Sequence, residues 1–442
     1  MNAPADTGFT VAPWPGLTPR LLSDGTESAA DYRNSGGYGE LADPAGLLEQ
    51  VGRAGLVGRG GAGFPMAVKL RTVREAGQSG RDTVVVANGE EGEPASVKDR
   101  WLLRNRPHLV LDGLRLAARI VGARHAHVYV SDPGSATSVQ AALAEVGVDG
   151  LGGLTVSVRT VAPGYVAGEE SAAVRAINGG PAKPTDKPPR VFEEGVGGLP
   201  TLVSNVETLA NLAWIHRHGA DEYRTQGTAG SPGTFLATIT GGGRPAGLYE
   251  LPFGTPVSEL LALHGISADQ VRGALMGGYF AGLLGSAVVS ATLDHETLRR
   301  AGSALGCGAV SVIIDECPVA VAAAVLSYFD RENAGQCGSC FNGTAAMAAA
   351  AVALRDGTAT GDDLARLQRW SVVLRGRGAC ATLDAATNIA ASLLAEFPDL
   401  VDAHLTGSCS ACFEASAATG SGAAAAKYIA HRPFEVNWGQ PQ

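Results

Sequence analysis

The chain of 442 residues is poor in charged side chains, which make up 17% of it, and no block of Lys and Arg stands out. Because nucleic-acid binding needs a concentrated basic surface, this absence argues against a nucleic-acid partner. Apolar residues nevertheless make up 45% of the chain, whereas disordered chains are poor in them and rich in charge. The sequence therefore predicts a large folded protein, long enough for two to four domains of about 100–200 residues each.

The chain also lacks a secretory signal and a continuous apolar span. Residues 1–10 contain Asp6 and no apolar core. The uncharged run at 273–293 contains five glycines and three serines or threonines, which suit turns and short strands better than a membrane helix. The seven cysteines are an odd number in a chain without a signal, so disulfides are not expected. We expect a cytoplasmic protein without a membrane span of its own.

Glycine, in contrast, is abundant, with 60 residues, roughly twice the usual share. The glycines follow no G-X-Y period, which excludes collagen. Four of them fall within residues 58–63, and Lys69 follows. Such a segment leaves backbone N–H groups uncovered and suits a phosphate or a flat ring, although an ordinary tight turn is the alternative. It is not a G-x-G-x-x-G sequence after a strand, so the dinucleotide fingerprint does not apply.

The order of expected elements predicts an α/β layer that extends to about residue 220. A helix is expected from the Asp43-Pro44 start to Ala54, and a second one at 110–121. Three β-branched runs alternate with helical segments, as in a sheet covered by helices, and lie at 83–87, 126–130 and 154–161.

The remaining composition divides the chain further. Residues 1–40 are rich in Pro, Gly and Ser and predict an arm with little structure of its own. A linker is expected at 227–233, and short strands around one helix near 257–264 are expected in 234–300. The Ala-rich part that follows predicts a bundle of four helices, at 318–329, 341–354, 361–374 and 384–396.

Two polar segments follow expected strands, where ligands of open α/β sheets bind. Residues 88–94 contain three glutamates, which repel one another unless they are solvated or paired with ligand hydroxyls. Residues 164–171 contain Glu169 and Glu170. A solvated acidic loop and a routine strand–helix connection are the alternatives for these two segments.

A pair of cysteines, Cys337 and Cys340, directly precedes an expected helix, and Cys380 lies forty residues farther on. A helix N-terminus favours thiolates, and sites built only of thiolates suit zinc or an iron–sulfur cluster. A redox dithiol and small buried side chains are the alternatives.

Taken together and in this order, these segments resemble the NADH- and FMN-binding flavoprotein subunit of respiratory complex I and the equivalent subunits of NAD-reducing hydrogenases and formate dehydrogenases. The likeness extends over roughly residues 43–395. It rests on Gly-Arg-Gly-Gly-Ala-Gly-Phe at 58–64, Gly-Glu-Glu, Ser-Asn-Val-Glu-Thr at 204–208, Gly-Gln-Cys-x-x-Cys at 335–340, and residues 301–306.

The resemblance implies an α/β fold with a Rossmann-like FMN-binding domain, then a β-grasp (SLBB-like) module and a C-terminal helical bundle for an iron–sulfur cluster. The implied boundaries are an N-terminal arm at 1–42, an FMN/NAD(P)H-binding domain at 43–226, a β-grasp domain at 234–317, a cluster-binding domain at 318–405, and a Gly/Ala/Ser-rich tail with a C-x-x-C at 406–442.

The resemblance also implies roles for individual residues. FMN would be held by Gly58, Gly60, Gly61, Lys69, Asn88, Tyr165, Gly168, Asn205 and Thr208. The flavin and nicotinamide pocket would be lined by Glu91, Glu93, Glu169 and Glu170, with Glu91, Glu169 and Glu170 as catalytic residues and Phe64 stacking on the nucleotide. The implied reaction is hydride transfer from NADH or NADPH to FMN, then single-electron transfer to the cluster and to a protein acceptor or a small iron–sulfur partner subunit.

One departure from the family affects the cluster. Its motif C-x-x-C-x-x-C has Ala334 at the first position, so Cys337, Cys340 and Cys380 provide three thiolates where four are expected. A three-iron cluster, a ligand from elsewhere, or no cluster are the open alternatives. We expect a cluster, [4Fe–4S] rather than [3Fe–4S], that is completed from the tail by Cys409 or Cys412, with Cys412 taken as the metal ligand. Cys307 and Cys317 are expected to be buried fillers.

Other departures from the family affect residues of the expected nucleotide-binding site. Arg190 and Thr72 stand where aromatic side chains are expected, and Glu90 replaces an Asp. Arg190 can pair with a phosphate and so favour NADPH, or it can mark a site that has lost its nicotinamide. An electron-transfer flavoprotein fed by ferredoxin or another subunit, and a non-catalytic assembly module of the same fold, are therefore alternatives to the NAD(P)H dehydrogenase.

Overall fold

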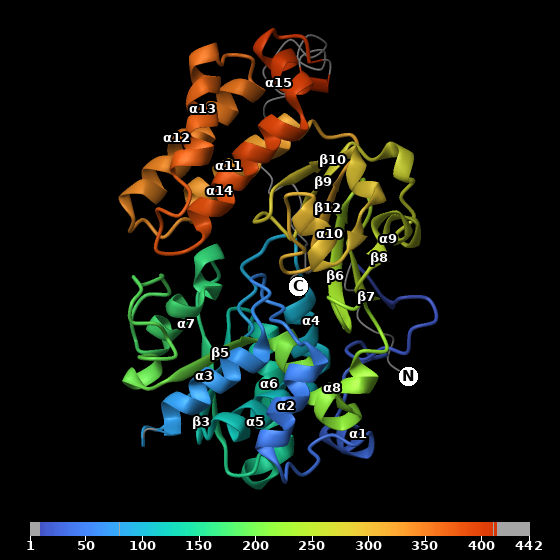
Figure 1. Cartoon of the computed structure of the whole chain (residues 1–442), viewed down its shortest axis with the longest axis vertical. Helices are drawn as coiled ribbons and strands as arrows, with labels where there is room; N and C mark the ends of the chain where they lie inside the picture. The colour runs from blue at the N-terminus through green and yellow to red at the C-terminus, as the bar shows by residue number, and fades with distance from the viewer. Residues whose placement is uncertain (1–8, 79, 410, 413–442) are drawn as a thin grey trace. The chain divides into compact units, whose positions relative to one another are not determined.

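The computed structural model of the chain describes residues 9–78, 80–409 and 411–412, and Figure 1 shows its helices and strands. Contacts divide these residues into two compact units. The first unit contains residues 9–92, 97–238 and 248–254, and the second contains 93–96, 239–247 and 255–412. Most of the Gly/Ala/Ser-rich tail expected at 406–442 lies outside the described residues.

The first unit contains a parallel four-stranded sheet with the order β4-β3-β2-β5. Its strands are β2 (Val84–Asn88), β3 (His125–Val130), β4 (Thr155–Thr160) and β5 (Thr201–Asn205). Residues 84–87 are completely or almost completely buried, as in a sheet covered on both faces. In the pairing register Asn88 lies opposite Asn205, so β2 and β5 end side by side. The three β-branched runs are thus confirmed as strands of one parallel sheet.

The helices of the first unit begin and end where local sequence favours it. Asp43 accepts hydrogen bonds from the backbone N–H groups of Ala45 and Gly46, and Gly55 ends the same helix at φ +72°. Gly113 lets two helices approach closely, because a Cβ there would lie 1.9 Å from the carbonyl oxygen of Leu209. The helices are α2 (Pro44–Ala54), α3 (Met66–Gln78), α4 (Lys98–Asn105), α5 (Pro107–Val121), α6 (Pro133–Gly150), α7 (Glu170–Ile177) and α8 (Val206–Tyr223), with 3₁₀ turns η1 (Tyr165–Gly168) and η2 (Val196–Gly198).

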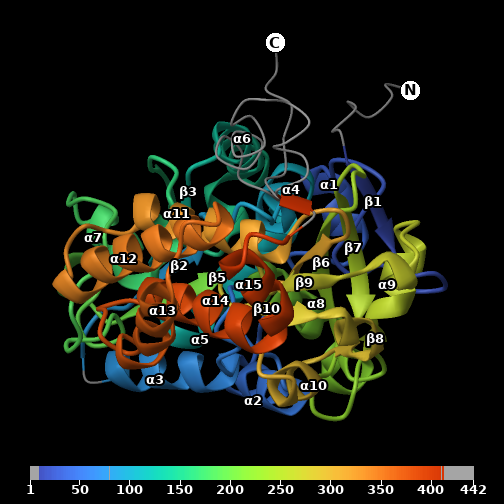
Figure 2. The ribbon, with the colours of Figure 1, turned by 90° about the horizontal axis from the view of Figure 1, so that it is seen from above.

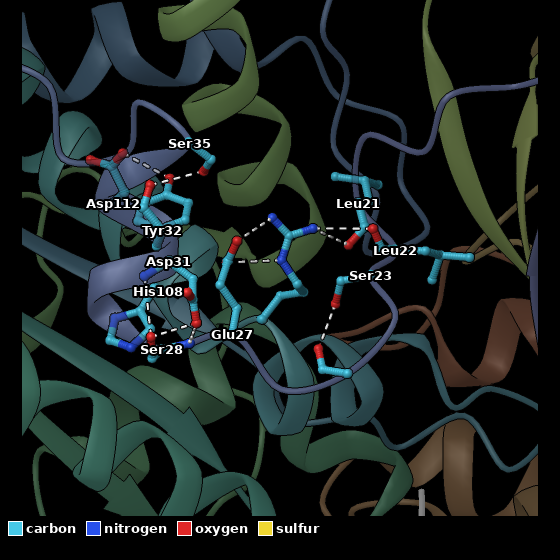
Figure 3. A network of polar contacts seen from close by, with 12 residues as sticks. Leu21, Leu22, Ser23, Glu27, Ser28, Asp31, Tyr32, Ser35, His108 and Asp112 are labelled. Atoms are coloured by element: carbon cyan, nitrogen blue, oxygen red, sulfur yellow. Dashed lines mark hydrogen bonds and ion pairs between the residues drawn. The ribbon is translucent and has the colours of Figure 1, made fainter. Parts of the chain in front are cut away.

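The N-terminal segment is more ordered than its composition predicts. It contains β1 (Thr10–Pro13) and α1 (Ala29–Asn34), and α1 begins with a reciprocal capping box between Ser28 and Asp31. Figure 3 shows how this segment is held: Tyr32 donates a hydrogen bond of 2.9 Å to Asp112, which lies 80 residues farther along the chain. The expectation of an arm with little structure is therefore wrong for these residues, because distant partners supply the order.

The second unit contains the antiparallel strands β9 (Gly273–Met276), β10 (Leu283–Gly285) and β12 (Ala309–Ile313), with β9 in the middle, and the short pair β8 (Thr255–Pro256) and β11 (Thr292–Leu293). Two longer strands, β6 (Thr234–Gly241) and β7 (Gly247–Pro252), are divided between the units. The 3₁₀ turns are η3 (Ala268–Gln270) and η4 (Ser286–Ser290). The uncharged run at 273–293 thus forms short strands and turns, as expected.

One helix is expected in this region, and the structure has two, α9 (Val257–Leu263) and α10 (His295–Arg300). The second of them is six residues long, and Asp294 caps it by accepting a hydrogen bond from the backbone N–H of Thr297. A helix of this length is too short to be recognised from the periodicity of its apolar residues. Across the part of the chain that the structure describes, no helix combines the length and the apolar composition that crossing a membrane requires.

The Ala-rich part of the second unit forms the four expected helices, α11 (Pro318–Glu332), α12 (Gly338–Arg355), α13 (Gly361–Val373) and α14 (Thr382–Glu396). Figures 1 and 2 both show α12, α13 and α14 side by side, and α11 packs against α12 and α14. A fifth helix, α15 (Pro398–Leu405), was not expected. Its first residue is a proline, which in the sequence marks the end of α14 as well as it marks the start of a new helix.

Candidate functional site

The glycine-rich segment forms a closed loop between α2 and α3. The backbone N–H of Gly58 donates a hydrogen bond of 2.8 Å to the carbonyl oxygen of Phe64, and an antiparallel bridge joins the flanking residues. Gly61 and Gly63 have φ values of +113° and +61°, which other residues rarely adopt. A Cβ at Gly61 would meet no atom within 4 Å, so the backbone there faces open space. A ligand can therefore approach the main chain directly.

Two predicted residues of α8 and its cap lie against this loop. A Cβ at Gly60 would lie 3.2 Å from the Cβ of Asn205, which caps α8 by accepting a hydrogen bond from the backbone N–H of Glu207. The hydroxyl of Thr208 accepts a 2.9 Å hydrogen bond from the backbone N–H of Arg59. Thr208 is completely buried, so its hydrogen bond fixes the loop to α8. The structure thus brings Gly58, Gly60, Gly61, Asn205 and Thr208 together.

The loops that follow β2 and β4 touch through their backbones. The side-chain Nδ2 of Asn88 also donates a 2.7 Å hydrogen bond to the carbonyl oxygen of Gly168. A Cβ at Gly168 would lie 2.9 Å from the carbonyl oxygen of Glu90, and a Cβ at Gly92 would lie 2.7 Å from that of Gly164. Glycine is therefore required on both sides of this contact. Tyr165 begins the 3₁₀ turn that contains Gly168.

Glu90 is buried between these loops. One of its carboxylate oxygens accepts a 3.3 Å hydrogen bond from the backbone N–H of Gly164, whereas Oε2 has no hydrogen-bond partner among the described residues. Burial, only partly opposed by hydrogen bonds from Ser131 and Gly164, raises the pKa of Glu90 to about 7. A buried acceptor without a partner is costly unless a ligand supplies the missing donor. Sequence reasoning gave Glu90 no role beyond a tolerated replacement.

A buried group of charged side chains contacts Asn205. The Lys98 ammonium lies 2.6 Å from Asp99 and 3.0 Å from Glu207, and Asn205 donates a 2.6 Å hydrogen bond to Asp99. Burial lowers the pKa of Lys98, but the two carboxylates outweigh this effect and raise it above its ordinary value. Burial, partly opposed by Lys98, raises the pKa of Asp99 above its ordinary value. Sequence reasoning missed these supports, although Lys98 and Asp99 closely follow the acidic loop.

A chain of partly exposed ion pairs joins α3 to α7. Lys69 donates a 2.7 Å hydrogen bond to the carbonyl oxygen of Val203 and lies 3.4 Å from Glu170. Lys187 lies 2.7 Å from Glu169 and 3.7 Å from Glu170. Glu169 also caps α7, because its carboxylate accepts hydrogen bonds from the first backbone N–H groups of that helix. The predicted residues Lys69, Glu169 and Glu170 are thus brought together, and Lys187 joins them.

The other predicted pocket residues have different environments. Glu91 accepts hydrogen bonds from the backbone N–H groups of Asp99 and Arg100 and pairs with the Arg100 guanidinium, so it holds the first turn of α4. Glu93 belongs to the second unit, where it accepts a 3.0 Å hydrogen bond from the backbone N–H of Tyr279. Phe64 is 51% exposed and free to stack on a ring.

A pocket of about 420 Å³ lies beside α7, between Ser171, Arg175 and the segment 185–195. None of the predicted cofactor residues lines it. It adjoins the segment that contains Arg190, the residue that stands in place of an expected aromatic ring.

The three predicted cluster thiols meet at the start of α12. Cys337 stands at the N-cap position of this helix, and the backbone N–H of Ala379, next to Cys380, donates a 3.4 Å hydrogen bond to its sulfur. Burial and the neighbouring sulfurs of Cys380 and Cys337 raise the pKa of Cys340 to about 12. Three neighbouring thiolates repel one another through their negative charges. The iron ions of an iron–sulfur cluster neutralise this charge, so the three thiols fit such a cluster.

Cys412 lies in a different group, which corrects its expected place beside these three thiols. Its sulfur and the ligand atoms of Cys317, His404 and Cys409 all lie within 4.8 Å of one another. Cys317 is buried, as expected, but it faces His404 rather than apolar side chains alone. This group was not predicted, because Cys317 and Cys412 lie far apart in the sequence.

Two family models match the chain. The FMN-binding domain of Nuo51 matches residues 51–214, and the iron–sulfur binding region of NADH-ubiquinone oxidoreductase-F matches residues 320–404. An NADH-quinone oxidoreductase F subunit of Rhizobium meliloti (strain 1021) is 31% identical over 85% of this chain and 93% of its own length. The NADP-reducing hydrogenase subunit HndC of Solidesulfovibrio fructosivorans is 30% identical over 86% of this chain and 81% of its own length.

A solved structure agrees with these matches. A chain of the NAD⁺-reducing [NiFe]-hydrogenase in the H₂-reduced state is 32% identical, with a TM-score of 0.76 over 82% of this chain. This chain spans 63% of the length of that hydrogenase chain, which is less than two thirds. The expected α/β fold with a C-terminal iron–sulfur region is confirmed, and the chain belongs to the family of the F subunits of NADH-quinone oxidoreductases.

Proposed function

We propose that this oxidoreductase takes an electron pair from NADH or NADPH on FMN and passes single electrons to an iron–sulfur cluster and on to a protein acceptor. The observation that carries the proposal is the convergence of loops at the ends of β2 and β5. The open glycine loop and Asn205 meet at one strand end, and Asn88 joins two further glycine loops at the other. Bound FMN supplies the conversion between two-electron and one-electron chemistry.

The residues of this region fit FMN. The glycine loop leaves backbone N–H groups open to a phosphate or a ring, and its Gly61 would not tolerate a side chain without strain. Glu90 Oε2 can accept a hydrogen bond from a ligand hydroxyl or N–H, which would relieve its lack of a partner. The buried group of Lys98, Asp99 and Glu207 holds Asn205 in place from below. We propose that these residues bind and orient the flavin.

We infer that the ion-pair chain positions the nicotinamide nucleotide. Glu169 and Glu170 are held by Lys69 and Lys187, so their carboxylates keep fixed directions while remaining partly exposed. Exposed Phe64 is available to stack on a nucleotide ring. Glu91 supports this region through the first turn of α4, and we propose that its part in catalysis is indirect.

We propose that the cluster is bound by three protein thiolates, those of Cys337, Cys340 and Cys380. Ala334 offers no ligand atom at the position where the family motif has a cysteine, and the sulfur of Cys412 belongs to another group. We further propose the domain boundaries 43–226, 234–317 and 318–405, and a partner subunit as the electron acceptor.

An anaerobic titration tests the proposal. Purified holoprotein is titrated with NADH and, separately, with NADPH, while the absorption of oxidised flavin is followed. Bleaching by either nucleotide supports the dehydrogenase. A protein that contains flavin but is bleached only by reduced ferredoxin or dithionite would instead be an electron-transfer flavoprotein. A colourless protein without flavin would point to an assembly module.

A further inference from the structure

Four potential metal ligands meet in the second unit, apart from the three thiols at the start of α12. The ligand atoms of Cys317, His404, Cys409 and Cys412 all lie within 4.8 Å of one another. The Sγ atom of Cys317 lies 3.3 Å from Nε2 of His404. Cys317, His404 and Cys409 are at most 4% exposed, and none of the three cysteines of this group forms a disulfide among the described residues. Three of the four ligands are therefore shielded from water, Cys412 is partly exposed, and the set is chemically suited to a soft or borderline metal ion.

The histidine of this group is oriented as metal ligands are. Its Nδ1 lies 3.0 Å from the carbonyl oxygen of Leu354 and 3.2 Å from that of Arg355. Since carbonyl oxygens only accept hydrogen bonds, Nδ1 carries the proton and donates. The lone pair of Nε2 is then directed to the side where Cys317 lies. A second ring nitrogen anchored by a backbone carbonyl is the usual support of a metal-binding histidine.

The backbone brings the three sulfurs to one side. Cys317 immediately precedes α11, whose first residue is Pro318, and His404 lies in the last turn of α15. Cys409 and Cys412 are joined by a tight turn in which the backbone N–H of Cys412 donates a 3.2 Å hydrogen bond to the carbonyl oxygen of Cys409. A C-x-x-C turn presents two thiols to a common centre, as in many Cys₃His zinc sites.

We propose that Cys317, His404, Cys409 and Cys412 bind one zinc ion in a closed, tetrahedral, structural site. Ligands at about 2.0–2.3 Å from one tetrahedral zinc lie about 3.3–3.8 Å from one another. The 3.3 Å between Cys317 Sγ and His404 Nε2 falls in this range, and the other ligand atoms lie within 4.8 Å of one another. Thiolates of an iron–sulfur cluster bind separate irons and therefore lie farther apart. All four positions are filled by protein atoms, so no position is left for substrate, as in structural rather than catalytic zinc sites.

The zinc joins the two ends of the helical bundle. Its ligands come from the start of α11 and from the end of α15 and the residues beyond it, whereas the three cluster thiols lie on α12 and just before α14. Because metal binding to such a site is coupled to folding, the ion stabilises the contact between the start of α11 and the end of α15. This role is independent of the flavin reaction.

Metal analysis of the purified full chain tests the site. Zinc, iron, acid-labile sulfide and FMN are measured per chain in the wild type, in Cys412→Ser and in Cys340→Ser. Cys307→Ser is the matched control, because Cys307 belongs to neither group. We expect one zinc per wild-type chain and at least about a tenfold weaker zinc affinity in Cys412→Ser, with iron, sulfide and FMN unchanged. Cys340→Ser should keep zinc and lose iron, and Cys307→Ser should keep both.

Cobalt exchange gives a second measurement that does not depend on how well a variant folds. Wild-type protein grown with Co²⁺ should show the visible bands of tetrahedral cobalt and sulfur-to-cobalt charge transfer. Wild-type protein without zinc and without these cobalt bands would overturn the proposal. Loss of iron and sulfide rather than zinc in Cys412→Ser would also overturn it and would make Cys412 a cluster ligand. Reactive thiols that form a disulfide in protein free of metal would identify a redox dithiol instead.

Discussion

Replacing Gly92 by Ala tests whether the loops after β2 and β4 are fixed by backbone contact. The added Cβ would lie 2.7 Å from the carbonyl oxygen of Gly164, and 2.9 Å from both the Cα and the carbonyl oxygen of Tyr165. All three neighbours are backbone atoms, so no side chain can turn aside. Overpacking of this kind costs about 1–3 kcal/mol, and the stiffer unfolded chain returns about 0.4–1 kcal/mol. We expect a net loss of about 1–2 kcal/mol.

The strain arises in the loops that we propose to bind FMN, so it should weaken FMN binding as well as folding. A loss of 1.4 kcal/mol corresponds to tenfold in the dissociation constant, and we expect an increase of roughly tenfold. Urea unfolding gives the stability, and quenching of flavin fluorescence by the apoprotein gives the affinity. Gly164→Ala is the matched control, because its Cβ would meet only the Cβ of Ala167 at 3.9 Å. Wild-type stability and affinity in Gly92→Ala, or an equal loss in the control, would refute the reasoning.

Three further predictions concern buried charge and the thiols. Lys98→Met removes the cation beside Asp99 and leaves Glu207 only the more distant Arg59, at 3.8 Å. It should lower the free energy of unfolding by about 3–5 kcal/mol in urea titrations, with partial recovery on adding Glu207→Gln, and an unchanged stability would contradict the ion group. The pKa of Glu90 is raised from 4.5 to about 7, so the stability that its protonated form contributes is lost as the pH rises through this range. Glu90→Gln apoprotein should therefore match the wild type near pH 4 and be about 1–3 kcal/mol more stable than it at pH 8, and a pH-independent difference in urea unfolding would count against this assignment. Cys340→Ser should lower iron and sulfide while FMN content and bleaching by the nucleotide persist; loss of the flavin instead would show that this thiol supports the first unit.

The sheet and the glycine loop could be predicted because their causes are local. The three β-branched runs produce the parallel strands β2, β3 and β4, of which β2 is the most completely buried. Four glycines in six positions produce a loop that needs positive φ values. The α11–α14 bundle followed from helical periodicity in the same way. The thiols of Cys337 and Cys340 were predicted to meet because a separation of three residues at a helix start brings them close.

Features that depend on distant partners could not be predicted. The order of α1 depends on Tyr32 reaching Asp112, and no local pattern indicates that pairing. Glu90 looks like one more solvated acid until the loop after β4 covers it. Cys317 looks like a small apolar side chain until α15 brings His404 to it. In each case the packing of segments far apart in the sequence sets the chemistry.

The central claim is that electrons pass from the nicotinamide through FMN to a cluster at Cys337, Cys340 and Cys380. The most direct test is an anaerobic sample of holoprotein given NADH or NADPH and followed by flavin absorption and by electron paramagnetic resonance. We predict that the flavin bleaches and that a reduced iron–sulfur signal appears in the wild type, whereas in Cys340→Ser the flavin bleaches and that signal is absent or altered. A flavin that stays oxidised with both nucleotides but is reduced by dithionite, or an identical signal in Cys340→Ser, would contradict the claim.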